Sequence, residues 1–138
     1  MSIDVRWDNA DKTIIRWQFN DNWTWDDYYG ALQISRQLCR QATYIVDIIV
    51  DMRDSKTLPN NVFTHAQNAL QTSSLNSGSI VVIGINPLLR SAYSAFKRLY
   101  DTMTRSSRNE LYLVALETKA YQIIQEVQAR RKKSTDKK

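Results

Sequence analysis

The sequence predicts a single α/β domain whose central sheet is mostly parallel and five-stranded, with an N-terminal antiparallel hairpin. Two observations predict this class. The chain opens with two alternating apolar segments joined by a short polar turn, and after them strand-length apolar runs alternate strictly with amphipathic stretches of helix length. Such alternation favours parallel strands joined by helical crossovers. The expected element order is β-β-α-β-α-β-α-β-α, and 138 residues fit one domain of this kind.

The opening hairpin is predicted by its alternation of apolar and charged residues. Ile3, Val5 and Trp7 alternate with charged residues, which is the period of a half-buried strand. Residues 9–12 have the composition of a turn, and residues 14–19 form a second strand. The short connection makes the pair antiparallel.

The first helix has a well-marked start. Thr24 is a good N-cap, and Asp27 follows three residues later as a variant of the capping box. Trp23 and Tyr28 have the spacing of a hydrophobic staple. An apolar face then continues to Ala42.

The later elements repeat this alternation of strands and helices. Residues 45–50 read as a strand buried on both faces except at Asp47. Asp47 and Asp51 should share one face of the sheet, because strand side chains alternate with a period of two. Further strands are expected at 80–85 and 111–116, helices at 60–70, 87–103 and from about 118, and polar loops at 51–59 and 73–79.

The positive charge of the chain is concentrated at its end. Residues 130–138 hold six Lys and Arg against Asp136, while the rest of the chain holds 13 basic and 13 acidic residues. The net charge of +5 therefore describes a tail. We expect a domain over residues 1–128 and a disordered basic tail over 129–138. Contact of this tail with nucleic acid or anionic lipid is the alternative, although no aromatic residues interleave with the charges.

Composition argues against several classes of function. Cys39 and His65 are single representatives of their types, so neither a disulfide framework nor a His/Cys metal cluster can form within the chain. Cys39 is expected as a small buried hydrophobe and His65 as a surface or boundary residue. No signal peptide and no apolar run of membrane length is visible. We expect a cytoplasmic, non-enzymatic protein with no cofactor and no metal.

The element order and the strand–loop–helix unit at 51–70 resemble the STAS-like superfamily, which includes the bacterial anti-sigma-factor antagonists. In the antagonists, the loop after the central strand reads Asp-Ser-Ser-Gly or Asp-Ser-Thr-Gly. Its serine is phosphorylated by a partner kinase, and phosphorylation breaks the complex. Here Asp54 and Ser55 match the first two positions, and the next serine or threonine and the glycine are missing. The resemblance implies Ser55 as the phospho-acceptor candidate.

The function implied by this resemblance is a regulatory module that binds another protein, of kinase-like or anti-sigma type. Binding would use the loop after the central strand, with these candidate residues: Asp51, Arg53, Asp54, Ser55 and Thr57. The alternative is a small-molecule or lipid-binding module that uses the cleft beyond the carboxyl ends of the strands, where ligands of open α/β sheets bind. Ordinary caps and loops are the structural alternative to both.

Aromatic residues are unusually dense at the start of the first helix. Trp25 and Tyr29 lie four residues apart and should share one face. That face packs on the sheet or hairpin, or it forms an interface with a partner or a second copy. A homodimer through this face or through a sheet edge is compatible with either function.

Overall fold

A computed structural model describes most of the chain. The described residues are 2–56, 60–61, 64–65, 76–84, 87, 90–91, 93–94, 97–98 and 111–136, with side chains up to residue 132. Thr57 lies outside them, as does most of the range of the expected helices at 60–70 and 87–103.

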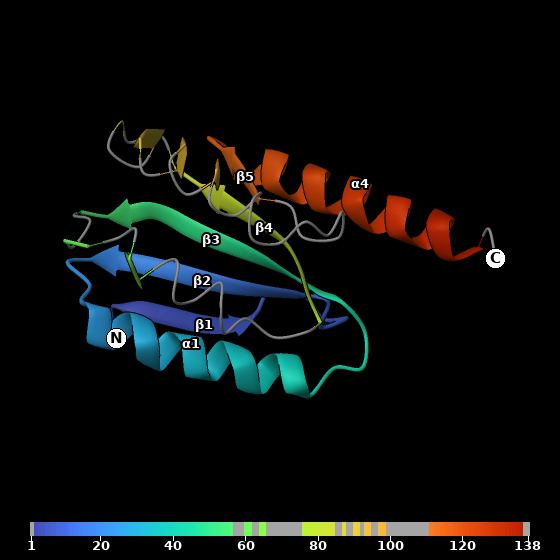
Figure 1. Cartoon of the computed structure of the whole chain (residues 1–138), viewed down its shortest axis with the longest axis horizontal. Helices are drawn as coiled ribbons and strands as arrows, with labels where there is room; N and C mark the ends of the chain where they lie inside the picture. Colours follow the sequence, from blue (N-terminus) through green and yellow to red (C-terminus); the bar gives the residue numbers. More distant parts are fainter. Residues whose placement is uncertain are drawn as a thin grey trace.

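A five-stranded mixed sheet forms the centre of the molecule (Figure 1). Its spatial order is β1-β2-β3-β4-β5, with β1 and β2 antiparallel and the other neighbours parallel. This confirms the α/β class and the hairpin followed by parallel strands. The strands are β1 (Ile3–Trp7), β2 (Ile14–Asp21), β3 (Val46–Ser55), β4 (Ser77–Ile83) and β5 (Leu111–Val114).

Asn9 organises the turn of the hairpin. Its Oδ1 accepts hydrogen bonds from the backbone N–H of Thr13 at 3.0 Å and of Ile14 at 3.1 Å. The turn includes Lys12 with a φ of 56°, in the left-handed region. A short polar side chain that bonds to nearby backbone favours such turns, as the sequence indicated.

Helix α1 (Trp25–Arg40) begins as predicted. Thr24 Oγ1 accepts from the Asp27 N–H at 3.2 Å, and the Asp27 carboxylate accepts from the Thr24 N–H at 3.0 Å. The rings of Trp23 and Tyr28 lie with centroids 6.4 Å apart, as the staple requires. The box satisfies backbone donors that helix geometry leaves without partners.

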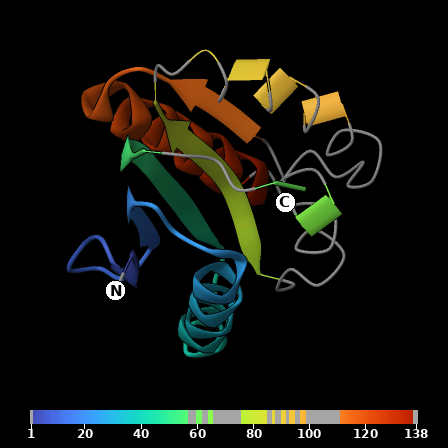
Figure 2. The ribbon, with the colours of Figure 1, turned by 90° about the vertical axis from the view of Figure 1, so that its left-hand side faces the viewer.

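Helix α1 covers one face of the sheet, and the C-terminal helix α4 (Glu117–Asp136) covers the other (Figures 1 and 2). The side chains of β2 point alternately to the two faces of the sheet and so join two different cores. Ile15 and Trp17 join the core under α1, and Ile14 joins the core under α4. Ala120 and Ile124 of α4 are fully buried there. Cys39 is buried under α1, as expected of a small hydrophobe.

The structure differs from the sequence interpretation at the end of the central strand. We expected a polar loop from Asp51, but β3 continues to Ser55. The reason lies in β2, which runs to Asp21 and pairs Asn20 with Asp54 and Asp21 with Ser55. β4 likewise begins at Ser77, inside the loop expected at 73–79, because it pairs with the start of β3.

The end of the chain also differs from expectation. Residues 129–136, expected in a disordered tail, continue helix α4. The helix is held there by contacts that side-chain composition does not reveal: Arg131 bonds to the buried Asp47 of β3, and Arg130 donates to the Tyr112 hydroxyl at 3.3 Å. In the part of the chain that the structure describes, no helix is long and apolar enough to cross a membrane.

Candidate functional site

Asp51 is a buried carboxylate held by two arginines. Its side chain is only 2% exposed. Arg16 Nη1 lies 2.9 Å from Oδ2, and Arg53 donates to both carboxylate oxygens, at 2.6 Å and 3.0 Å. Burial acts to raise the pKa of Asp51, but bonding and attraction from Arg53 and Arg16 outweigh it and hold that pKa below its usual range. The carboxylate is therefore a fixed negative charge.

Arg16 extends this cluster towards the hairpin and α4. Its Nε donates to Asp8 Oδ1 at 2.7 Å, and its Nη2 donates to the Tyr121 hydroxyl at 3.2 Å. The Tyr121 hydroxyl in turn donates to Asp8 Oδ2 at 2.5 Å. Burial alone lowers the pKa of Arg16, yet the bonds to Asp8 and Tyr121 more than offset it and the pKa rises. The guanidinium stays charged although the residue is only 4% exposed.

Glu117, the first residue of α4, closes the cluster. It lies 2.7 Å from Arg53 Nη2 and 3.4 Å from Arg16 Nη2. Burial and the bond to Asp8 raise the pKa of Tyr121, which keeps its proton for that bond. We call this set the charged network: Asp8, Arg16, Asp51, Arg53, Glu117 and Tyr121. It joins the hairpin, β3 and α4, and each of its charged groups is paired with a group of opposite charge, which is the chemistry of a structural clamp rather than of an open reactive site.

Asp47 forms a second polar centre at the other end of β3. It is fully buried. Its Oδ1 accepts from the Ser79 N–H at 2.9 Å, from the Ser79 hydroxyl at 2.8 Å and from Arg131 at 2.5 Å, and Oδ2 accepts from Gln128 at 3.0 Å. Asp47 and Asp51 both face α4, which confirms the prediction that they share a face.

A register shift in β3 aims Ser55 at the opposite face. Gln18 pairs with Asp51 but Asn20 pairs with Asp54, so β3 carries one extra residue there. Such a bulge reverses which side chains point to which face. Asp54 therefore lies on the Gln18 side, and Ser55 turns towards α1, where its hydroxyl accepts from Trp23 Nε1 at 2.9 Å. The Ser55 side chain is half-buried.

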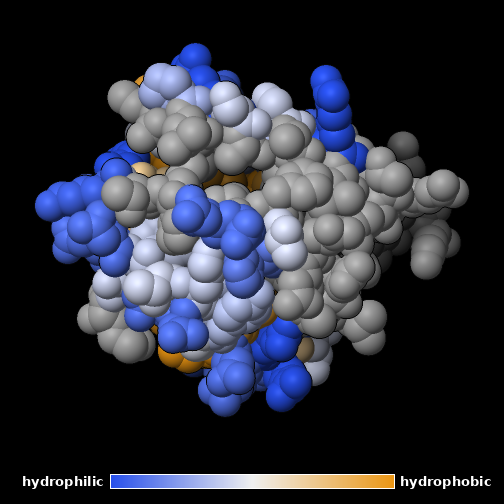
Figure 3. Space-filling view, turned by 60° about the vertical axis from the view of Figure 1, so that its left-hand side comes forward, coloured by the Kyte–Doolittle hydropathy of each residue, from blue (hydrophilic) through white to orange (hydrophobic). Residues whose placement is uncertain are grey.

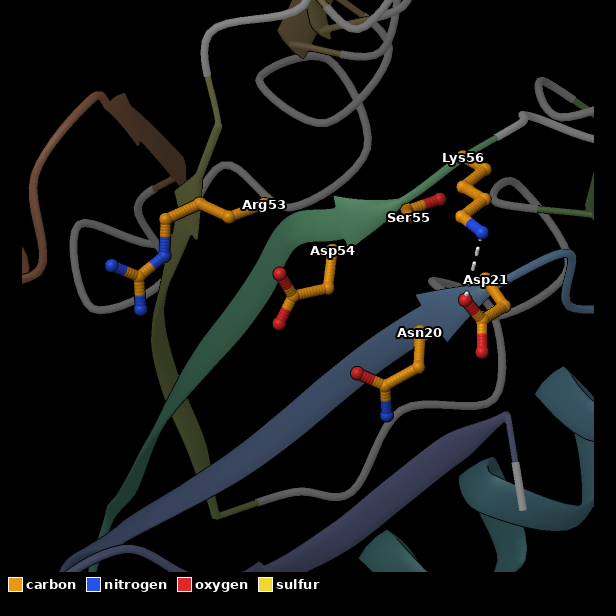
Figure 4. Close-up of a pocket in the computed structure, with 6 residues that line it drawn as sticks. All are labelled: Asn20, Asp21, Arg53, Asp54, Ser55 and Lys56. Carbon is orange, nitrogen blue, oxygen red and sulfur yellow. Dashed lines mark ion pairs between the residues drawn. The ribbon is translucent and has the colours of Figure 1, made fainter.

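An open pocket of about 630 Å³ lies where β2 and β3 end (Figure 4). Lys56 Nζ and Asp21 Oδ1 form an exposed ion pair of 3.5 Å across it, while Arg53 points away from that pair. On this side of the molecule, hydrophilic residues predominate among the atoms coloured by hydropathy (Figure 3). The described lining residues are Asn20, Asp21, Arg53, Asp54, Ser55 and Lys56.

The structure thus brings together four of the five candidate residues at one strand end, and Thr57 lies outside the described residues. It gives them different roles. Asp51 is buried in ion pairs and is not one of the described lining residues of the pocket, whereas Arg53, Asp54 and Ser55 line it. The sequence indicated the strand end, and the bulge then separates Ser55 from Asp51.

Trp25 and Tyr29 pack against a segment that follows β3. The Trp25 ring stacks on His65 with centroids 4.1 Å apart, and its Nε1 donates to the Asn60 carbonyl at 2.6 Å. The Tyr29 hydroxyl lies 2.5 Å from His65 Nδ1. Both aromatic side chains are half-buried. Their shared face therefore contacts the chain itself, and His65 is a boundary residue, as expected.

Sequence reasoning missed most of the charged network. Arg16 gave the one available signal, because it is the one charged residue within the expected strand 14–19. Asp8 and Tyr121 gave none, because a hairpin turn and a helix face commonly carry such residues. Among the described residues, no group of three His, Cys, Asp or Glu side chains is arranged to hold a metal ion.

Comparison with known proteins identified no relative of this chain. Neither protein-family models, curated proteins nor solved structures gave a match to the chain.

Proposed function

We propose that this protein is a non-enzymatic regulatory module that binds another protein through the carboxyl end of β3 and the segment after it. The observation that carries the proposal is the open polar pocket at the ends of β2 and β3. It presents side chains of both signs at the position that the resemblance to anti-sigma-factor antagonists implies.

The charged network supports binding rather than chemistry at this place. The side chain of Asp51 is 2% exposed, and its carboxylate is bonded to Arg16 and Arg53. A ligand in the pocket would therefore find no free Asp51 carboxylate to react with. The side chains of Asp21 and Lys56 are 72% and 70% exposed and available to a partner. Exposed charges at the rim of an interface set specificity and association rate more than affinity.

A switch at Ser55 is part of the proposal. Phosphate on Ser55 adds a charge of about −1.5 to −2 at neutral pH. The added charge would lie next to Asp54 in the chain and opposite Asp21 in the β2–β3 pairing. Repulsion from the carboxylate of Asp21, the residue paired with Ser55, would disturb the pocket rim and weaken docking, in the direction that the resemblance implies.

Site-specific photocrosslinking in the source cell tests the docking site. A photoreactive residue replaces Lys56, and the control replaces Lys119, which is exposed on α4. We expect one discrete crosslinked protein from position 56 and none from position 119. Asp54→Lys should weaken that crosslink by reversing a charge at the rim. No discrete protein at position 56, or equal crosslinking at both positions, would refute the proposal.

A small-molecule or lipid-binding module is the second candidate function. The observation that favours it is another open pocket, of about 320 Å³, at the ends of β4 and β5, bordered by Gly84, Arg90 and Tyr93 among others. Native mass spectrometry of protein purified from its own cells tests this candidate. A retained non-protein adduct that Gly84→Trp removes would support it, and protein of bare chain mass would count against it.

A further inference from the structure

Strand β1 is an edge of the sheet, and no strand among the described residues pairs with its outer side. It pairs with β2 on one side and ends the strand order on the other. Figure 2 shows β1 at the left margin of the sheet, next to the N-terminus. An edge strand presents backbone donors and acceptors that can pair with another strand.

The hydrogen bonds of the hairpin show which groups of β1 point outward. The Asp8 N–H donates to Ile14 O and the Asn20 N–H donates to Ser2 O, both at 2.7 Å. In an antiparallel pair, bonded and non-bonded positions alternate. Even-numbered residues of β1 therefore bond to β2. The N–H and C=O groups of Ile3, Val5 and Trp7 point to the open edge.

We propose that β1 pairs with β1 of a second copy of this chain, antiparallel, with Val5 on the two-fold axis. The two Val5 residues then face each other and exchange their N–H···O=C bonds. Ile3 of each copy lies opposite Trp7 of the second copy, so every outward group of these residues finds a partner. The two sheets become one continuous sheet. This inference is independent of the docking pocket.

Charge selects this register. With Val5 on the axis, Asp4 lies opposite Arg6 of the second copy at a non-bonded position, where side chains approach most closely. Both residues are exposed, and neither side chain forms a hydrogen bond or ion pair with the described residues. They lie on the face opposite α1, since they pair with Gln18 and Arg16.

In the neighbouring registers that use the same outward-pointing backbone groups, like charges lie opposite each other. Moving the axis to Asp4 places the two Asp4 carboxylates opposite each other. Moving it to Arg6 places the two guanidinium groups opposite each other, and Asp4 opposite Asp8. Like charges directly across a strand pair are destabilising. A strand that carries Asp4 and Arg6 on either side of Val5 is therefore complementary to itself in one register.

The expected dimer is weak and reversible because the strand is short. Five residues per copy form a small interface, and small interfaces are typical of transient association. Sedimentation equilibrium of the full chain, from micromolar to near-millimolar concentration, should show a monomer–dimer equilibrium. A protein that stays monomeric over this range would overturn the proposal.

Variants of β1 test the register. Val5→Pro removes an outward N–H without removing a hairpin bond, and proline is tolerated at such edge positions. Reversal of one charge, in Asp4→Arg or Arg6→Asp, should weaken association about tenfold by turning two attractive pairs into repulsive ones. The double variant Asp4→Arg/Arg6→Asp should restore it. Circular dichroism confirms that each variant is folded.

Two results would contradict the proposed pairing of β1 with β1. A dimer that Val5→Pro leaves unchanged would form through another surface. If both single reversals weaken association and the double variant fails to restore it, the register is wrong. Since Asp4 and Arg6 are exposed, these two variants keep the test open even where Val5→Pro does not fold.

Discussion

Replacing Arg16 tests whether the charged network stabilises the fold by joining the hairpin, β3 and α4. Arg16→Met keeps the length and apolar stem of the side chain and removes its charge. The guanidinium lies 2.7 Å from Asp8, 2.9 Å from Asp51 and 3.2 Å from the Tyr121 hydroxyl. The residue itself is 4% exposed, so water does not replace these contacts.

The expected loss of unfolding free energy follows from what the variant leaves behind. Asp8 and Asp51 have side chains 8% and 2% exposed, and both would lose a cation. Removing one partner of a buried ion pair destabilises by about 3–5 kcal/mol. Asp51 keeps Arg53 and Asp8 keeps the Tyr121 hydroxyl, so we expect about 3 kcal/mol, the lower end of that range.

Urea denaturation followed by tryptophan fluorescence measures this loss. Trp17 and Trp23 are buried in the α1 core, on the face of the sheet opposite the Arg16 side chain, and report on unfolding of that core. Lys119→Met is the control, because Lys119 is exposed on α4 and its replacement should change stability by less than about 0.5 kcal/mol. The denaturant slope should be the same in both variants.

A double-mutant cycle with Asp8→Asn separates the pair from the general effect of removing a charge. The double variant should be less destabilised than the sum of the single variants, since neutralising Asp8 removes one of the unpaired carboxylates. A loss below about 1 kcal/mol for Arg16→Met would refute the reasoning, because that is the value of an exposed pair. Additive effects in the cycle would show that Asp8 and Arg16 do not interact.

Two further predictions concern β3 and its neighbours. The pKa of Asp51 is lowered in the fold, so its contribution to stability is complete above the unfolded pKa of about 3.9 and is lost as the pH falls through the folded value. The difference in unfolding free energy between the wild type and Asp51→Asn should be constant from neutral pH to pH ~5 and shrink below pH ~4; a difference that grows in acid would contradict it. Gly78→Ala should destabilise by about 1–3 kcal/mol, because the new Cβ would lie 2.6 Å from Asp47 Oδ1 and 2.7 Å from Ile45 Cγ2. Its control is Gly30→Ala on α1, where nothing lies within 4 Å and alanine should stabilise by about 0.5–1 kcal/mol; equal thermal shifts for the two alanines would contradict the close approach at Gly78.

Local patterns predicted the hairpin, the start of α1 and the common face of Asp47 and Asp51. Each depends on residues close together in the chain. The capping box needs only Thr24 and Asp27, and the two aspartates share a face because strand periodicity is two. The position of the candidate pocket was also predictable, since it follows from where parallel strands end.

Contacts between distant segments decided the rest. The sequence alone determined that there are five strands and that most of them run parallel. It did not determine that β3 continues to Ser55, because that depends on the length of β2. Nor does composition show that Arg131 of the basic segment neutralises Asp47, or that Arg16 joins Asp8, Asp51 and Tyr121. A buried charge requires a partner, but only the packing of α4 on the sheet determines which residue supplies it.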